Sequence, residues 1–230
     1  PPRSTLFPYT TLFRSGVVAR LAPTLWYDPS DPATVTLDQD GRITGLLNKG
    51  TKSGMDAVSG IANGGVPLLA PRLATGTLSY AASCLPMISI DSNNWGLVSS
   101  GNTDITGSMS RTVAGIFARE SNNAGPVVSF GTPGLALLYE VGDRQNGNVV
   151  GCYGNGNDFI VTPLNPIQQA NLHVAANISS NVNAFWRTGV DPTTATFTLA
   201  SSLATANSPF FIGQRPTVAD RGDFRGQSGE

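Results

Sequence analysis

Short apolar runs recur along the chain, separated by clusters of Gly, Asn, Pro and Ser. Each run has about four to eight residues, which is the usual length of a β-strand. Several runs alternate with a period of two: Val113, Gly115 and Phe117 share one face, as do Val174, Ala176 and Ile178. Such alternation is typical of half-buried strands in two packed sheets. The predicted strands are Leu25–Tyr27, Val35–Leu37, Ile43–Leu47, Met87–Ile90, Gly96–Val98, Arg111–Arg119, Gly125–Phe130, Leu135–Val141, Asn148–Tyr153, Asp158–Thr162, Asn171–Ile178, Val182–Arg187, Thr194–Leu199 and Phe210–Ile212.

The segments between these runs carry turn chemistry. Asp40-Gly41 and Asn63-Gly64 supply the positive φ that tight turns need. Helix-like phrases are short and are confined to residues 31–34 and 165–170. No linker is long enough to divide the chain, so we expect a single all-β domain over residues 21–230, built as a two-sheet antiparallel sandwich.

The two ends of the chain look foreign or cut. Residues 1–15 carry two near-copies of one phrase, at 5–8 and 11–14, and are similar to translated sequencing-adapter read-through in environmental sequence data. We expect this segment to be a non-native scar that packs poorly on the rest. A native hairpin is the alternative. At the other end, the pattern of a strand begins after Asp223, which predicts a C-terminally truncated domain.

Composition narrows the functional classes. Charged residues make up 13% of the chain, about half the usual share, and the net charge is −1. This balance offers no field for nucleic-acid phosphates, and no apolar run is long enough to span a bilayer. The abundance of Ser, Thr, Asn and Gly favours an extracellular or virion-associated β domain.

Cys84 and Cys152 are the only cysteines. Their spacing fits neither a metal site nor a CxxC redox motif. Two free thiols are favoured, and one disulfide stays open as an alternative.

Ten phrases follow one another in an order that is informative as a whole. They are Leu25–Pro32, Thr36–Ile43, Asn48–Ala57, Ile88–Leu97, Arg111–Arg119, Val127–Gly131, His173–Asn177, Ala184–Val190, Ser208–Gly213 and Asp223–Gly226. This order resembles that of bacterial and phage laminin-G-like, concanavalin A-like domains. The resemblance covers about residue 25 to the end, with Ser92 departing from the usual Gly. It implies a jelly roll of two curved sheets and, for most of the family, glycan binding, adhesion or a structural role.

Catalytic motifs are missing from the sequence. Glycoside hydrolysis needs two carboxyl groups that flank the bond. Glu140 and Asp143 are three residues apart, which places them on opposite faces of a strand, and Glu120 and Glu230 are isolated. His173, the only histidine, lies in a predicted strand without a nucleophile motif nearby. We therefore expect a structural histidine and no catalytic residues.

Calcium is the one ion that the sequence leaves open. Asp and Asn side chains on loops supply the oxygen ligands that it prefers. Asp38–Gly41, Asp91–Asn94 and Asn155–Asp158 are such clusters, although Asp and Asn at turns are usually turn formers. No cofactor or metal site is predicted.

The best local candidate for ligand binding is the Gly-rich stretch 151–159. It combines an aromatic ring with amide and carboxylate groups, as a sugar site requires. A mobile hairpin tip is the alternative. Trp26, Trp95 and Trp186 lie in strand phrases, so we expect all three to pack in the core. The predicted ligand-binding residues are Tyr153, Asn155, Asn157 and Asp158, with Asp143 and Asn146 on the preceding loop, which we expect to lie beside them.

These observations lead to one function and two rivals. We expect a non-catalytic carbohydrate-binding or surface-adhesion module of a larger secreted or virion protein. Its partners would be a glycan or cell-surface polysaccharide and neighbouring domains of the parent protein. The rivals are a purely structural phage tail or tail-fibre domain and a glycoside hydrolase-type catalytic or accessory domain.

Overall fold

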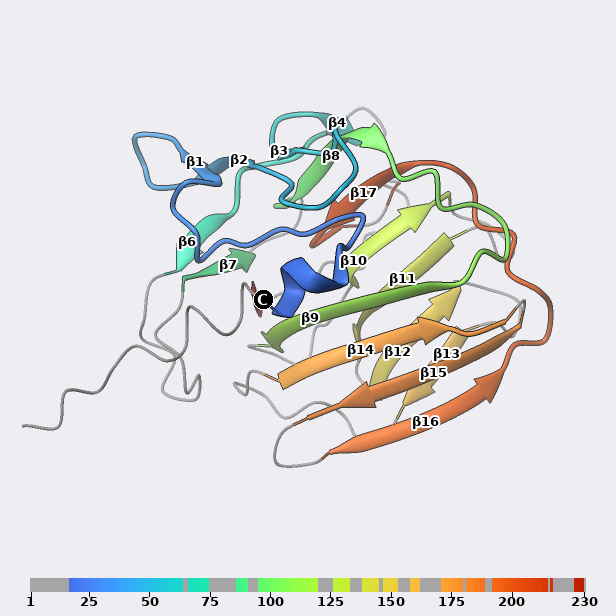
Figure 1. The fold of residues 1–230 in the computed structure, drawn as a ribbon. Helices are drawn as coiled ribbons and strands as arrows, with labels where there is room; N and C mark the ends of the chain where they lie inside the picture. Colours follow the sequence, from blue (N-terminus) through green and yellow to red (C-terminus); the bar gives the residue numbers. More distant parts are fainter. Residues whose placement is uncertain are drawn as a thin grey trace, which may run out of the picture.

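The computed structural model describes thirteen stretches of the chain, and within them it is almost entirely antiparallel β-structure (Figure 1). Helix is limited there to a short segment at 17–21. The described residues are 17–63, 66–74, 86–90, 95–119, 126–132, 138–144, 147–152, 158–161, 171–179, 181–188, 192–214, 216 and 226–229.

The larger sheet has nine strands in the order β1-β2-β3-β8-β17-β10-β11-β12-β13. Their bounds are β1 Val35–Leu37, β2 Ile43–Leu46, β3 Ala57–Val58, β8 Leu97–Asn102, β17 Pro209–Ile212, β10 Pro126–Gly131, β11 Leu138–Arg144, β12 Gly147–Cys152 and β13 Asp158–Val161.

The smaller sheet has seven strands in the order β16-β15-β14-β9-β18-β7-β6. Their bounds are β16 Thr193–Thr198, β15 Val182–Arg187, β14 Asn171–Asn177, β9 Arg111–Arg119, β18 Gly226–Gly229, β7 Met87–Ile90 and β6 Arg72–Ala74. A separate pair is formed by β4 Ala62–Asn63 and β5 Val66–Pro67.

The chain crosses repeatedly between the two sheets. It passes from β7 to β8, from β8 to β9 and from β9 to β10, and it crosses again after β13, β16 and β17. As a result β18 is inserted between β9 and β7, which lie far earlier in the sequence. In Figure 1 the strands β9, β14, β15 and β16 lie in front of β10 to β13.

One hydrophobic core joins the inner faces of the two sheets. Phe159 of β13 stacks on Phe197 of β16 with ring centroids 3.4 Å apart. The guanidinium of Arg111 on β9 lies 5.2 Å from the ring of Tyr139 on β11. The aromatic side chains thus bridge the sheets, and burial of their apolar area holds the layers together.

The inner face of the smaller sheet is unusually polar. His173, Asn177, Asn183 and Arg187 are all buried there. Val174 and Ala176 of β14, with Ile178 just beyond it, do share a face as predicted, but they lie on the outer side of the sheet, away from the core. The period of two was right, whereas the more apolar face is not the buried one.

Most of the predicted strands are confirmed within a residue or two, and Arg111–Arg119 and Val182–Arg187 have the predicted bounds. Leu25–Tyr27 is wrong, because the backbone N–H of Trp26 donates to the side chain of Asn48 at 2.8 Å instead of to a sheet ladder. The helix-like phrase at 31–34 is a turn. The expected scar at 1–15 and the phrase at 165–170 lie outside the described residues.

Candidate functional site

The residues predicted to bind a ligand lie mostly outside the described part of the chain. This is true of Asn146, Tyr153, Asn155 and Asn157. For Asp143 and Asp158 the structure describes the backbone, which places them on β11 and β13. Their role in binding stays a prediction.

The strand register shows where the strands that flank these two loops end. The β11–β12 connection follows Arg144, which pairs with Gly147 at one end of β12. The β12–β13 connection begins after Cys152, at the other end of β12. Since strands rise about 3.3 Å per residue, the two connections are separated by roughly the full length of a six-residue strand. The described strand ends from which the two loops start therefore lie at opposite ends of β12, and the placement of the loop residues themselves stays a prediction.

The three tryptophans have different environments. Trp26 is buried, with the ammonium of Lys49 4.3 Å from its ring centroid. Trp95 packs against the core under the guanidinium of Arg42, at 4.5 Å. Trp186, in contrast, is 44% exposed on β15, so the expectation that it packs in the core is wrong. The register explains the error, since Trp186 pairs with Val174 and Thr194 on the outer face of the smaller sheet.

Trp186 stands within a broad uncharged surface, which we call the Trp186 face. It comprises the outward positions of four adjacent strands, and none of these positions carries an ionisable side chain. Apolar groups lie near its middle and threonines along its β16 border. The face consists of Thr112, Ala114, Ile116, Leu172, Val174, Ala176, Val182, Ala184, Trp186, Thr194, Thr196 and Thr198.

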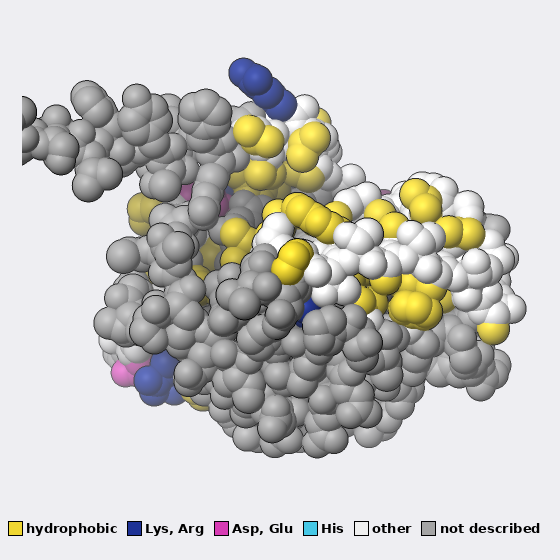
Figure 2. All heavy atoms as spheres, turned by 90° about the horizontal axis from the view of Figure 1, so that it is seen from below, with side chains coloured by type: hydrophobic (Ala, Val, Ile, Leu, Met, Phe, Trp, Pro, Cys, Tyr) yellow, Lys and Arg dark blue, Asp and Glu magenta, His cyan; other side chains and the backbone are white. Residues whose placement is uncertain are grey.

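The register aligns the side chains of this face in rows across the strands. One row runs from Ala114 through Val174 and Trp186 to Thr194, and the next runs from Thr112 through Ala176 to Thr196. In the view from the β16 side (Figure 2), yellow apolar side chains lie over the described surface on the right, among white atoms that belong to the backbone and to other side chains. A single exposed apolar side chain is common on proteins, but a continuous neutral patch around a Trp indicates an interaction surface.

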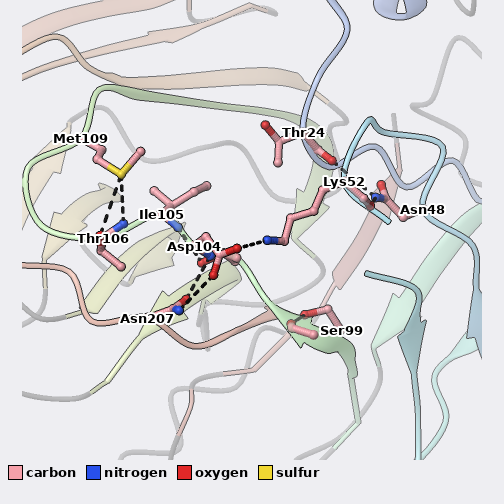
Figure 3. A network of polar contacts seen from close by, with 11 residues as sticks. Thr24, Asn48, Lys52, Ser99, Asp104, Ile105, Thr106, Met109 and Asn207 are labelled. Atoms are coloured by element: carbon pink, nitrogen blue, oxygen red, sulfur yellow. Dashed lines mark hydrogen bonds and ion pairs between the residues drawn. The ribbon is translucent and has the colours of Figure 1, made fainter. Parts of the chain in front are cut away.

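A polar cluster joins three segments of the chain near the larger sheet (Figure 3). The Lys52 ammonium donates to Asp104, and the amide of Asn207 donates to the same carboxylate at 3.0 Å. The hydrogen bond from Lys52, followed by that from Asn207, lowers the pKa of Asp104. Asp104 also has a positive φ of 59°, which Asp adopts more readily than most residues. Lys52 and Asn207 both bind Asp104, so the cluster holds three loops together.

Lys49 forms the centre of a similar structural cluster. Its ammonium lies 3.2 Å from an oxygen of Asp28 and 3.0 Å from an oxygen of Asp31. Burial opposes the charge on Lys49, but the hydrogen bonds to Asp31 and Asp28 outweigh it and raise the pKa of the lysine. The hydrogen bond from Lys49 likewise lowers the pKa of Asp31. The cluster fixes the turn that follows Trp26.

His173 occupies the polar inner face as a buried strand residue. Its ring is 1% exposed and stacks on Phe117 with centroids 3.6 Å apart. Neither ring nitrogen has a hydrogen-bond partner among the described residues. Burial, reinforced by the nearby charge of Arg187, lowers the pKa of His173 well below its usual value. A neutral, enclosed imidazole of this kind packs with its neighbours and has no contact with the surface.

The calcium candidates gain little from the structure. The Asp38 carboxylate accepts hydrogen bonds from the backbone N–H groups of Asp40 and Arg42, each at 2.9 Å, and so acts as a turn former. Asp91–Asn94 lies outside the described residues, as does 155–157. The described stretches contain no group of three or more His, Cys, Asp or Glu side chains placed to hold a metal. They also contain no helix long and apolar enough to cross a membrane.

No model of a known protein family matches the chain, and no curated protein is significantly similar to it.

Proposed function

We propose that this chain is a non-catalytic recognition module that binds a neutral polysaccharide through the Trp186 face. The observation that carries the proposal is the exposed Trp186 ring, centred on an uncharged sheet surface and flanked by Val174 and Thr194. Sugar rings present flat C–H surfaces that stack on an exposed indole, and removing that area from water favours binding. A polymer that carries carboxylates or sulfates would find no basic partner on this face.

The threonines of the face supply the polar half of such a site. Thr194, Thr196 and Thr198 are exposed on β16, and Thr194 pairs with Trp186 in the register. Each hydroxyl is both a donor and an acceptor, as sugar hydroxyls require. Apolar surface with a few fixed polar groups is the usual composition of a small-ligand site, and rigid strands hold these groups in place.

We also propose the finer description of the fold as a concanavalin A-like jelly-roll sandwich. The repeated crossings between a nine-stranded and a seven-stranded antiparallel sheet support it. The phrase-by-phrase resemblance of the chain to laminin-G-like domains supports this description of the fold as well. A domain of this type within a larger extracellular or virion protein fits the proposed role.

A binding panel tests the function. The 230-residue chain is incubated with neutral polysaccharides, namely cellulose, β-1,3-glucan, xylan and mannan, and with the charged polymers alginate and hyaluronate. We expect binding to at least one neutral polymer. Trp186→Ala should weaken it by about tenfold or more, as the loss of a central aromatic contact typically does.

Leu69→Ala is the matched control, because Leu69 is 51% exposed but lies outside the Trp186 face. It should leave binding unchanged. Circular dichroism of both variants checks that the fold is intact. Binding that survives in Trp186→Ala would refute the assignment of the face, whereas no binding of the unmodified chain to any polymer would favour the rival structural role.

A further inference from the structure

Strand β16 ends the smaller sheet on the side next to Trp186. It pairs with β15 and has no second neighbour among the described strands. The larger sheet ends at the same side with β13, whose Phe159 stacks on Phe197 of β16. The side chains of β16 next to this edge are exposed to solvent, namely those of Thr194, Thr196 and Thr198.

The hydrogen-bond pattern shows which residues of β16 direct their backbone groups away from β15. The N–H of Leu199 donates to the carbonyl of Asn181 at 2.7 Å, and bonded pairs alternate along an antiparallel ladder. Phe197 and Ala195 therefore bond to β15 through their backbone. Thr194, Thr196 and Thr198 direct their N–H and C=O groups away from β15, toward the edge.

Among the residues that the structure describes, this edge carries none of the usual protection against pairing. Exposed edge strands are normally blocked by lysine, proline, a bulge or an inward charge. The six residues Thr193–Thr198 contain no charged residue and no proline, and their register with β15 is continuous. Threonine and phenylalanine also favour the extended conformation. An open edge of this composition is a template for another strand.

We propose that the partner is a second copy of this chain, paired antiparallel through β16 about a two-fold axis at Thr196. In this register Thr196 faces Thr196 of the other copy, and Thr194 faces its Thr198. Every edge-facing backbone group of these threonines then gains a partner. The side chains match as well, because the outer pairs are all Thr–Thr and the inner pairs place Ala195 beside Phe197.

Self-complementarity is what selects a second copy over an unrelated extended peptide. A two-fold contact requires a strand to pair with an identical strand, and β16 pairs all three of its outward threonines when Thr196 faces Thr196 of the other copy. An unrelated peptide would not depend on this register. The inference is independent of polysaccharide binding.

Sedimentation velocity over a wide range of protein concentrations tests the association. We expect a monomer–dimer equilibrium whose dissociation constant rises by about tenfold or more in Thr196→Lys, because two like charges would then face each other across the axis. Thr112→Lys is the matched control. It lies on the same outer face and in the same cross-strand row, but on β9, which has neighbours on both sides. It should leave the dimer unchanged.

Cross-linking tests the register. In a background with Cys84→Ser and Cys152→Ser, Thr196→Cys should be joined efficiently by a short bis-maleimide, since the paired Cα atoms would lie about 5.5 Å apart. Thr194→Cys should be joined poorly, because the two copies of that residue would be separated by about 13 Å along the strands.

Three outcomes would overturn the proposal. They are a chain that stays monomeric at every concentration, a dimer weakened by Thr112→Lys and not by Thr196→Lys, and cross-linking that favours position 194 over position 196. The first would leave the edge to a different partner strand, and the second would move the contact to the Trp186 face. Circular dichroism shows whether each variant keeps its fold.

Discussion

Mild acid should destabilise this fold through His173. The imidazole is buried between Phe117 and Phe185, and its burial, together with Arg187 on the neighbouring strand, holds its pKa well below the ordinary value of 6.5. In the unfolded chain the same imidazole takes up a proton near that ordinary value. As the pH falls below 6.5, the unfolded state therefore binds a proton that the folded state does not.

The magnitude follows from this difference in proton binding. Stability is at its full value above pH 6.5 and falls by up to about 1.4 kcal/mol per pH unit below it. At pH 5 the total loss is about 2 kcal/mol, provided that the folded imidazole is still neutral. Because His173 is the only histidine, no other side chain of that type titrates in this interval.

Urea unfolding at a series of pH values between 7.5 and 5 measures the effect as a change in the free energy of unfolding. His173→Phe is the control, since a phenyl ring fits between the same aromatic neighbours but cannot bind a proton. Its stability should be nearly independent of pH over this interval. A flat profile for the unmodified chain, or an equal slope in His173→Phe, would refute the assignment of His173 as the acid-sensitive group.

Other substitutions have effects that the structure also specifies. Gly213→Ala should lower the free energy of unfolding by about 2 kcal/mol or more, because Gly213 has a φ of 78° and an added methyl would collide with Ile90. An unchanged melting temperature would contradict this. Arg111→Met should lower the free energy of unfolding by about 3 kcal/mol, since the buried guanidinium donates to two backbone carbonyls and a threonine hydroxyl. Chemical denaturation measures this, and a loss below about 1 kcal/mol would mean that these hydrogen bonds add little. Lys52→Met should leave the melting temperature almost unchanged in high salt, because the contact of Lys52 with Asp104 is exposed and is screened by salt. A large drop in the melting temperature in high salt would show that the ion pair contributes more.

The sequence was sufficient to predict the elements with long, regular patterns. Arg111–Arg119 and Val182–Arg187 combine β-branched and aromatic residues with clear turns on both sides, and they have the predicted bounds. Very short strands such as Ala57–Val58 were missed. Two residues carry no periodicity, and the pairing of such a strand depends on neighbours that are distant in the sequence.

The sequence did not predict which face of a strand meets the core. In β14 the buried positions include Asn171, His173 and Asn177, while the more apolar Val174 lies outside. Alternation defines the two faces of a strand, but it does not show which face is buried when both contain apolar and polar residues. The same ambiguity placed Trp186 in the core, so the strongest described candidate for binding was missed. The available signal was the threonine-rich run Thr193–Thr198, which follows the strand of Trp186 after a short connection.

The position of β18 has a consequence for how quickly the chain folds. Gly226–Gly229 completes the smaller sheet by joining Met87–Ile90 to Arg111–Arg119, so this closure links segments separated by about half of the sequence. Contacts of such long range are slow to form, because the entropy of a large loop is lost before any pairing compensates for it. Until β18 is inserted, two inner strands have bare edges, and newly made chains at high concentration should aggregate more readily than mature ones.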